Sequence, residues 1–343
     1  MNFEIGKCKV GEGQRPFIIA EVGSCWGTFE HVKDSIGLAK NCGADAVKFQ
    51  FFTPQDLYGF PSHEYEAGVS PWFHHGWLAG LKQKADASGI ELLCSAFSVD
   101  GLKAVDPYVS AHKLASSENN HLRMLEWLRD CGKPVLLSTG GSGKSDIGLA
   151  MATVNGLNYK SDEIQKRIAE VRPLENTRAI PLYCVSDYPA KRINLERVAE
   201  LKAQYGIAGY SDHSLDAHEI PYQATRSYGA CVVEKHVNFF DVQGPDAPHS
   251  LSREDFKAMC DRLRGNAVAE SGQKEMTTRH NRRLIATKPI QIGEKLLEGV
   301  NFGIYRSTTD DLNGASPFMI DKYNGKEAKR LIFAGDSIGR DEV

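Results

Sequence analysis

Paired cysteines, a strong net charge and long apolar runs are all missing from this sequence. The eight cysteines are scattered and form no Cys-x-x-Cys pair, which argues against a disulfide framework or a zinc ribbon and favours a reducing cytoplasm. The net charge of −3 gives no drive toward nucleic acid or anionic membranes. The N-terminus lacks the apolar core of a secretion signal, and the apolar run at 17–22 is far too short to span a bilayer. We expect a cytosolic protein with no nucleic-acid or membrane partner.

Nucleotide-binding signatures are also missing. Gly23 and Gly27 follow the first apolar run, but they do not form the Gly-x-Gly-x-x-Gly fingerprint of a dinucleotide-binding fold. The string GGSGKS at residues 140–145 resembles the end of a P-loop, but Ser138 stands where that motif needs a glycine. We interpret this string as a loop after the fifth predicted strand.

Strand-like apolar runs alternate with segments long enough for helices. With 41% hydrophobic and 25% charged residues, the composition is that of a globular protein. The predicted strands are Phe17–Ser24, Ala46–Phe52, Glu91–Phe97, Ala111–Ser117, Pro134–Gly140, Ile180–Ser186, Ala208–Ser214 and Cys231–Val237. Eight such units in about 270 residues predict an α/β fold, a TIM (β/α)8 barrel. An open doubly wound sheet is the alternative.

The pattern changes after about Gly272. A polar, basic stretch predicts a linker at 273–283, and short apolar runs with a turn at Gly293 predict a small β-rich domain at 284–343. Such a domain is marginal by itself, so docking onto the barrel at 1–272 would help it.

The stretch 209–236 carries two histidines at equivalent positions. Two strands joined by one helix are parallel, so His213 and His236 fall at the same end of neighbouring strands. Such strands lie about 5 Å apart, close enough for two imidazoles to share a metal at roughly 2.1 Å each. A hydrogen-bonded structural role for each histidine is the alternative.

Polar residues at strand carboxyl ends are the site candidates in a barrel. They are Glu21, Lys48, Gln50, Ser95, Lys113, Ser116, Ser117, Glu118, Ser138, Ser186, Tyr188, Ser211, His213, Glu234 and His236. Lysines and hydroxyls on one rim suit a small phosphorylated anion. Lys48 and Lys113 stand between apolar neighbours, and burial without a partner anion is costly. Surface lysines and strand-end serines that satisfy loop amides remain the alternatives.

Several strings together resemble the sialic acid synthase family, the phosphoenolpyruvate-condensing synthases of nine-carbon sugar acids. They are IIAEVG, GADAVKFQ, KLASSE, PVLLSTG, YSDHS, VVEKH and GPD, with KPIQIGEKL and NGKEAKRLIFAGDSI resembling the antifreeze-like domain of that family. The resemblance covers nearly the whole chain. It implies a domain-swapped homodimer that adds phosphoenolpyruvate to the aldehyde of an N-acylated aminohexose with a divalent metal, Mn²⁺ or Mg²⁺.

The resemblance also implies roles for single residues. His213 and His236 would hold the metal. The phosphoenolpyruvate would be surrounded by Lys48, Ser95, Lys113, Ser116, Ser138, Ser186 and Ser211. The sugar would face Glu21, Gln50, Tyr188 and Asp246, with Arg306 reaching from the partner chain. Glu118 would orient or deprotonate reacting groups.

Three positions depart from the family pattern. Cys25 and Trp26 replace an Asn-His pair, Ser186 stands where Asn is common, and the residues at 307–310 replace Pro-Gly-Asn-Gly. All three concern the sugar end of the site or its neighbourhood. A Schiff-base aldolase with Lys113 or Lys48 as nucleophile, and an inactive binding or scaffold homologue, remain alternative functions.

Overall fold

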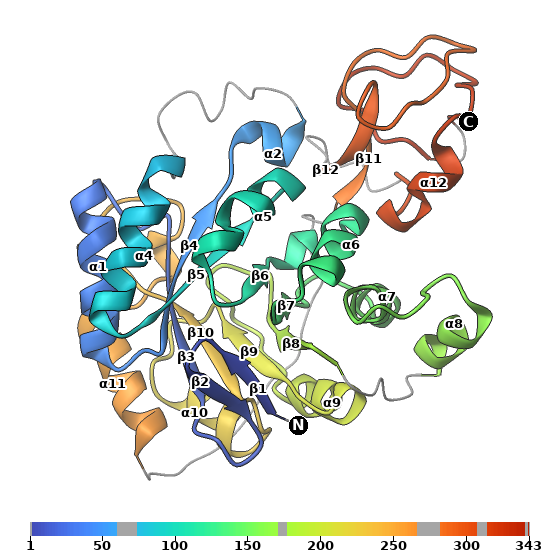
Figure 1. Ribbon diagram of the computed structural model, residues 1–343. Helices are drawn as coiled ribbons and strands as arrows, with labels where there is room; N and C mark the ends of the chain where they lie inside the picture. Colours follow the sequence, from blue (N-terminus) through green and yellow to red (C-terminus); the bar gives the residue numbers. More distant parts are fainter. Residues whose placement is uncertain are drawn as a thin grey trace.

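A closed eight-stranded parallel barrel forms the larger part of the protein in the computed structural model (Figure 1). The structure describes residues 2–59, 74–170, 177–265, 282–306, 314–339 and 342. The barrel closes in the order β10-β3-β4-β5-β6-β7-β8-β9. Its strands are β3 (Phe17–Gly23), β4 (Ala46–Phe51), β5 (Glu91–Ala96), β6 (His112–Leu114), β7 (Val135–Ser138), β8 (Ala179–Tyr183), β9 (Gly209–Asp212) and β10 (Val232–His236). The predicted TIM barrel is confirmed, and the open doubly wound sheet is wrong.

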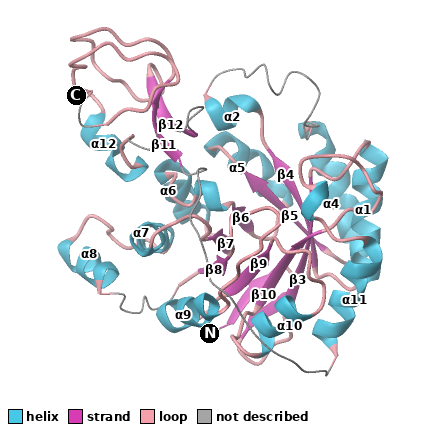
Figure 2. Cartoon of the chain, turned by 180° about the vertical axis from the view of Figure 1, so that it is seen from behind, coloured by secondary structure: helices cyan, strands magenta, loops and turns pink. Residues whose placement is uncertain are grey.

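Helices surround the barrel (Figures 1 and 2). They are α1 (Phe29–Cys42), α4 (Leu78–Ser88), α5 (Val99–Val105), α6 (Leu122–Cys131), α7 (Lys144–Val154), α8 (Asp162–Ala169), α9 (Glu196–Tyr205), α10 (Glu219–Arg226) and α11 (Arg253–Arg264), with a short α2 (Pro54–Tyr58) after β4. The local sequence explains the ends of α1: the Thr28 hydroxyl accepts the His31 amide, and Gly43 ends the helix with φ at 100°. The inner face of α1 buries Val32, Ile36 and Ala39. No helix within the described residues is long and apolar enough to cross a membrane.

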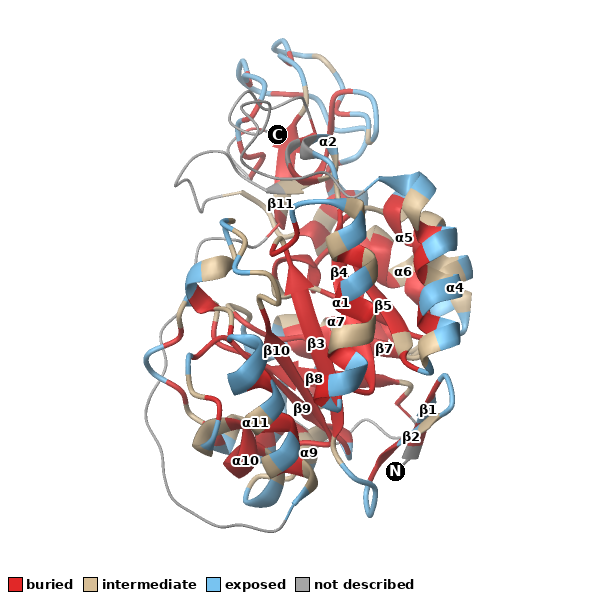
Figure 3. Ribbon diagram, turned by 90° about the vertical axis from the view of Figure 1, so that its left-hand side faces the viewer, coloured by how far each residue is buried: buried red, intermediate tan, exposed pale blue. Residues whose placement is uncertain are grey.

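The amino end of the barrel is closed by a hairpin that the sequence analysis missed. Its strands are β1 (Asn2–Ile5) and β2 (Cys8–Gly11), and they pair antiparallel. Phe3, Ile5 and Val10 pack against buried barrel residues that include Phe17 and Leu136. The barrel interior is therefore apolar at this end, and polar side chains enter it at the carboxyl end. Figure 3 shows how fully the strands are buried.

A small unit follows the barrel and contains a two-stranded antiparallel sheet. Its elements are β11 (Arg282–Ala286), β12 (Phe302–Arg306) and the short helix α12 (Ile320–Tyr323). Isolated bridges such as Ile290 with Ile332 tie its loops together. A small β-rich C-terminal unit is thus confirmed. The sheet begins at Arg282, which is inside the predicted linker 273–283. The sequence prediction placed this arginine in solvent, but its side chain is buried. The rest of the linker lies outside the described residues.

The C-terminal unit docks on the barrel beside α2 and α6 (Figure 1). The Arg282 guanidinium donates to the Glu118 carboxylate, and both side chains are fully buried. Arg123 on α6 donates to Glu298 at 2.8 Å and to Asp321 at 2.9 Å. A buried ion pair surrounded by partly exposed ones therefore fixes this unit near the end of the barrel where the strands terminate.

Candidate active site

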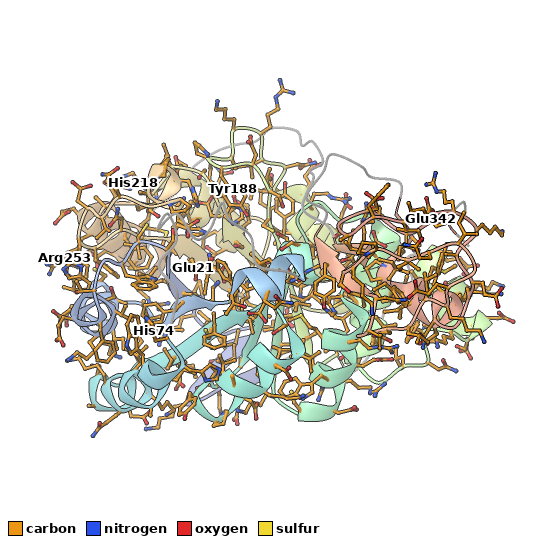
Figure 4. The ribbon with its side chains drawn as sticks, turned by 90° about the horizontal axis from the view of Figure 1, so that it is seen from above. Glu21, His74, Tyr188, His218, Arg253 and Glu342 are labelled. Atoms are coloured by element: carbon orange, nitrogen blue, oxygen red, sulfur yellow. The ribbon has the colours of Figure 1, made fainter. Side chains whose placement is uncertain are left out.

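Polar side chains enter the barrel from the carboxyl ends of its strands. The register sets Glu21 beside Lys48 on β3 and β4, and Ser95 beside Lys113 on β5 and β6. These side chains point inward because they keep the parity of apolar interior residues two positions earlier, such as Ile19 before Glu21. Figure 4 looks down on the molecule from above and labels Glu21 and Tyr188 in this region.

Lys48 is the centre of one half of a buried network. Its Nζ lies 2.7 Å from Glu21 Oε2 and donates to Ser95 Oγ at 2.9 Å. Gln50 donates from Nε2 to Glu21 Oε1 at 3.2 Å. The Lys48 Nζ is also 3.7 Å from Glu234 Oε1. Five residues predicted from four separate strands thus form one connected group.

Lys113 is the centre of the other half. Its Nζ donates to Ser138 Oγ at 2.8 Å and lies 3.7 Å from the same Glu234 Oε1. Ser211 donates its hydroxyl to that oxygen at 3.0 Å. The side chain of Glu234 therefore links both lysines. Lys48 and Lys113 are only 3% and 2% exposed, so the partner anions that the sequence analysis required are Glu21 and Glu234.

The four charged groups titrate differently because their surroundings differ. Burial raises the pKa of Glu21 to about 7, although Lys48 opposes the rise. Burial also opposes ionisation of Glu234, but Lys113 and Lys48 outweigh it and lower its pKa to about 2. Burial lowers the pKa of Lys113. Burial also acts to lower the pKa of Lys48, but Glu21 and Glu234 outweigh it and raise the pKa of that amine. Glu21 is therefore the carboxyl group able to hold or release a proton near neutral pH.

The two predicted metal-binding histidines lie side by side, as expected. The ring centroids of His213 and His236 are 5.6 Å apart. His213 places Nδ1 2.6 Å from the carbonyl oxygen of Val185. A carbonyl oxygen only accepts, so Nδ1 carries the proton and Nε2 is left as a ligand atom. Burial lowers the pKa of His213 to about 4 and holds that of His236 well below its usual value. Both rings are therefore neutral at pH 7, which metal binding requires.

His249 is a site residue that the sequence analysis missed. Ligand atoms of His236, Asp246 and His249 all lie within 4.8 Å of one another, a spacing that one metal ion could bridge. The Asp-x-x-His spacing within a short 3-10 turn brings Asp246 and His249 to one side, and this spacing was the available signal. The Tyr188 ring lies against His213 and His249, with centroid separations of 4.4 and 4.8 Å. The residues present therefore fit a divalent metal.

The remaining predicted residues fall in three places. Ser116 and Ser186 meet at the rim with their hydroxyl oxygens 3.4 Å apart. Glu118 is engaged with Ser117 and with Arg282 of the C-terminal unit. Arg306 ends β12, but its side chain lies outside the described residues. The 307–310 segment also lies outside them.

The unusual pair after β3 has well-defined packing. Cys25 is fully buried with its sulfur 3.4 Å from the Ser250 hydroxyl oxygen. Burial raises the pKa of this thiol to about 11, so it is not a thiolate at neutral pH. Trp26 donates from its indole nitrogen to the Gly23 carbonyl at 3.1 Å and packs edge-on against Trp77. The pair thus fills space and braces the loop that approaches Asp246.

Comparisons with known proteins agree with this geometry. The model of the NeuB family matches residues 35–275. An uncharacterised protein of Methanocaldococcus jannaschii is 32% identical over 321 residues, 88% of each chain. The pseudaminic acid synthase of Campylobacter jejuni subsp. jejuni serotype O:2 is 29% identical over 357 residues, covering 95% of this chain and 96% of that one. The crystal structure of a spore coat polysaccharide biosynthesis protein from Bacillus subtilis superposes with a TM-score of 0.81 at 27% identity, covering 100% of this chain and 99% of that one. The resemblance to the sialic acid synthase family is confirmed: the chain belongs to the NeuB family.

Proposed function

We propose that the protein condenses phosphoenolpyruvate with the aldehyde of an N-acylated aminohexose, giving a nonulosonic acid and phosphate. The observation that carries this proposal is the buried Lys48–Lys113 pair, which lies at one end of a barrel beside the histidine cluster. The similarity to a pseudaminic acid synthase supports the same class of transferase.

The two lysines suit an anionic substrate. The phosphate and carboxylate of phosphoenolpyruvate would take the ammonium groups of Lys48 and Lys113 as charge partners, with hydroxyls of Ser95 and Ser138 as directed donors. Since these hydroxyls already contact the lysines, the cradle exists before the substrate binds. Preorganised charge of this kind contributes to rate by positioning and by stabilising developing charge.

The reaction needs one proton and one water. The methylene carbon of phosphoenolpyruvate attacks the aldehyde carbon, and a carbon–carbon bond forms while the aldehyde oxygen becomes a hydroxyl. Glu21, whose pKa is raised to about 7 chiefly by burial, would supply that proton. Water then adds to the cationic enol carbon, and phosphate leaves by carbon–oxygen cleavage. His213 and His236 would hold a divalent metal, which supplies Lewis-acid polarisation of the aldehyde.

Phosphate release across a panel of sugars tests this proposal. The panel holds N-acetylmannosamine, its 6-phosphate and diamino-dideoxyhexoses of the legionaminic and pseudaminic type. Release should depend on one of these sugars, vanish in His213→Ala or His236→Ala, stop in chelator and return with Mn²⁺. Full activity in excess chelator would remove the metal from the proposal. No release with any sugar would favour the binding or scaffold alternative.

A Schiff-base aldolase is the second candidate. The observation in its favour is Lys113, because burial lowers the pKa of its amine and a neutral amine is the nucleophile such chemistry needs. Borohydride in the presence of pyruvate would trap a reducible adduct on an aldolase. The synthase should form none, so an adduct on Lys113 would decide for the aldolase.

We also propose that the protein works in the cytosol as a domain-swapped homodimer in which Arg306 of one chain serves the site of the other through an antifreeze-like C-terminal domain. Within one chain the C-terminal unit docks on its own barrel, so the proposal requires a second copy of the chain to supply that unit instead. Its support is the resemblance of the tail sequence to the antifreeze-like domain. Arg306→Ala should then raise the KM for the sugar and affect phosphoenolpyruvate little.

Mixing inactive His213→Ala and Arg306→Ala chains, after dissociation and reassociation, tests the exchange. With random pairing about a quarter of the sites would be intact. No recovery despite proven subunit exchange would mean that each site is built within one chain.

A further inference from the structure

The end of β10 and the segment after it place two imidazole rings and a carboxylate together. The residues are His236, Asp246 and His249, and their ligand atoms lie within 4.8 Å of one another. His236 Nδ1 and His249 Nε2 are buried and have no hydrogen-bond partner within the described part of the chain. The two histidines are only 5% and 3% exposed. Buried polar atoms normally have a hydrogen-bond or metal partner, so these two nitrogens are candidate ligand atoms.

The spacing inside this cluster matches that of ligands on one ion. His249 Nε2 lies 3.4 Å from Asp246 Oδ1, longer than a good hydrogen bond between nitrogen and oxygen. Two ligands at about 2.1 Å from one ion lie about 3.0 Å apart as octahedral neighbours and about 3.4 Å apart in a tetrahedral site. The ring centroids of His236 and His249 are 4.5 Å apart, closer than the 5.6 Å between His213 and His236. His249 is thus nearer to His236 than the other expected ligand is.

The carboxylate of this cluster is held in place from behind. The Ser24 amide donates to Asp246 Oδ2 at 2.7 Å, which leaves Oδ1 directed toward His249. Gly23 has φ of 56°, and a Cβ there would come within 2.3 Å of Asp246 Oδ2. The close approach of this backbone therefore depends on glycine. Partners of this kind orient metal ligands from the outer side.

We propose that His249 binds the divalent metal directly, together with His236 and Asp246. This inference rests on the proposed function for the role of the metal, and it makes the site a two-histidine, one-carboxylate set. His213 lies beside this set, with its ring centroid 5.6 Å from that of His236. Such a set suits first-row transition metals such as Mn²⁺, Fe²⁺ or Co²⁺ and leaves positions for substrate oxygens. Mg²⁺ prefers oxygen ligands and keeps its waters. The site should therefore select a transition metal over Mg²⁺.

Metal titration of the apoprotein tests this assignment without substrate. Free Mn²⁺ is followed by its paramagnetic resonance signal, and bound Co²⁺ by its visible absorption. His249→Ala should weaken Mn²⁺ binding at least about tenfold and alter the Co²⁺ spectrum, because a nitrogen ligand is lost. His218→Ala is the matched control, since His218 is an exposed histidine placed apart from Glu21 (Figure 4). Wild-type protein should bind Mn²⁺ more tightly than Mg²⁺.

Two further variants protect the test against loss of folding. Asp246→Asn keeps the shape of the side chain and should also weaken Mn²⁺ binding. His249→Gly leaves a space that added imidazole can fill, and imidazole should restore the Co²⁺ spectrum. Mn²⁺ affinity of His249→Ala within threefold of wild type, with an unchanged Co²⁺ spectrum, would overturn the proposal and show that His249 only packs beside Asp246.

The outcome is separable from that of the proposed function. If His249→Ala loses metal affinity while wild type forms no sugar acid with any sugar, the metal assignment stands and the proposed reaction fails. If wild type forms the sugar acid and His249→Ala binds Mn²⁺ normally, the reaction stands and the assignment fails.

Discussion

Arg282 offers the sharpest test of how the C-terminal unit is held. Its side chain is fully buried and donates to the Glu118 carboxylate, to the Asp56 carbonyl at 2.8 Å and to the Phe97 carbonyl at 2.7 Å. Arg282→Met would leave Glu118 as a buried charge without its cation. Breaking a buried pair from one side costs about 3–5 kcal/mol, a large fraction of the total stability of a protein.

The same physics predicts the result of a double-mutant cycle. Replacing both partners, Arg282→Met with Glu118→Met, removes the unpaired charge as well as the pair, so the loss should shrink to about 1 kcal/mol. The loss of stability in Arg282→Lys should lie between those of Arg282→Met and the double variant, because a single ammonium cannot reproduce the planar guanidinium that donates to several acceptors. The control is Arg129→Met, whose exposed pair with Asp130 should contribute less than about 1 kcal/mol.

The assay is the free energy of unfolding from urea titrations of wild type, the four variants above and Glu118→Met alone, which completes the cycle. Hydrogen exchange in β12 and α2, which contact each other, reports on undocking separately from unfolding. The reasoning is refuted if Arg282→Met costs no more than Arg129→Met. It is equally refuted if the double variant loses the sum of the two single losses.

Two other predictions concern buried ionisable groups. Burial, helped by Arg282, lowers the pKa of His121 to about 3. Below pH 6.5 the unfolded chain therefore binds a proton that the folded chain does not, and this group should cost about 2 kcal/mol of stability at pH 5. If the free energy of unfolding of His121→Asn changes with pH as steeply as that of wild type, this prediction is contradicted. Lys235 is fully buried, and its Nζ lies 2.6 Å from Asp212 Oδ2. The same amine donates to the Ser214 carbonyl at 2.6 Å and so holds the loop after His213. Lys235→Met should destabilise the protein by about 3–5 kcal/mol in urea titrations, and a loss below 1 kcal/mol would count against the pair.

The barrel could be predicted because each strand is a short apolar run followed by a helix. On the inward face, Ile19 is followed by Glu21 on β3 and Ala46 by Lys48 on β4, and this change from apolar to polar at the strand end also located the candidate site. Closure of the barrel then brought together side chains from strands that do not pair, such as Lys113 on β6 and Glu234 on β10.

Other features could not be predicted because their cause is tertiary. The residues of β1 and β2 look like a polar start with scattered apolar positions, and only the open amino end of the barrel explains them. Arg282 belongs to a basic stretch that is typical of a linker, and its burial depends on Glu118 and on carbonyls of α2 and of the loop after β5. His249 falls beyond the last strand, where strand-end reasoning does not reach.

The fate of the bridging oxygen of phosphoenolpyruvate tests the central claim most directly. Substrate carrying ¹⁸O between the enol carbon and phosphorus is supplied with the accepted sugar, and both products are analysed by mass spectrometry. Carbon–oxygen cleavage predicts that the label leaves with inorganic phosphate and that the new sugar acid carries an oxygen from solvent instead. Label retained in the sugar acid, with unlabelled phosphate, would contradict the account.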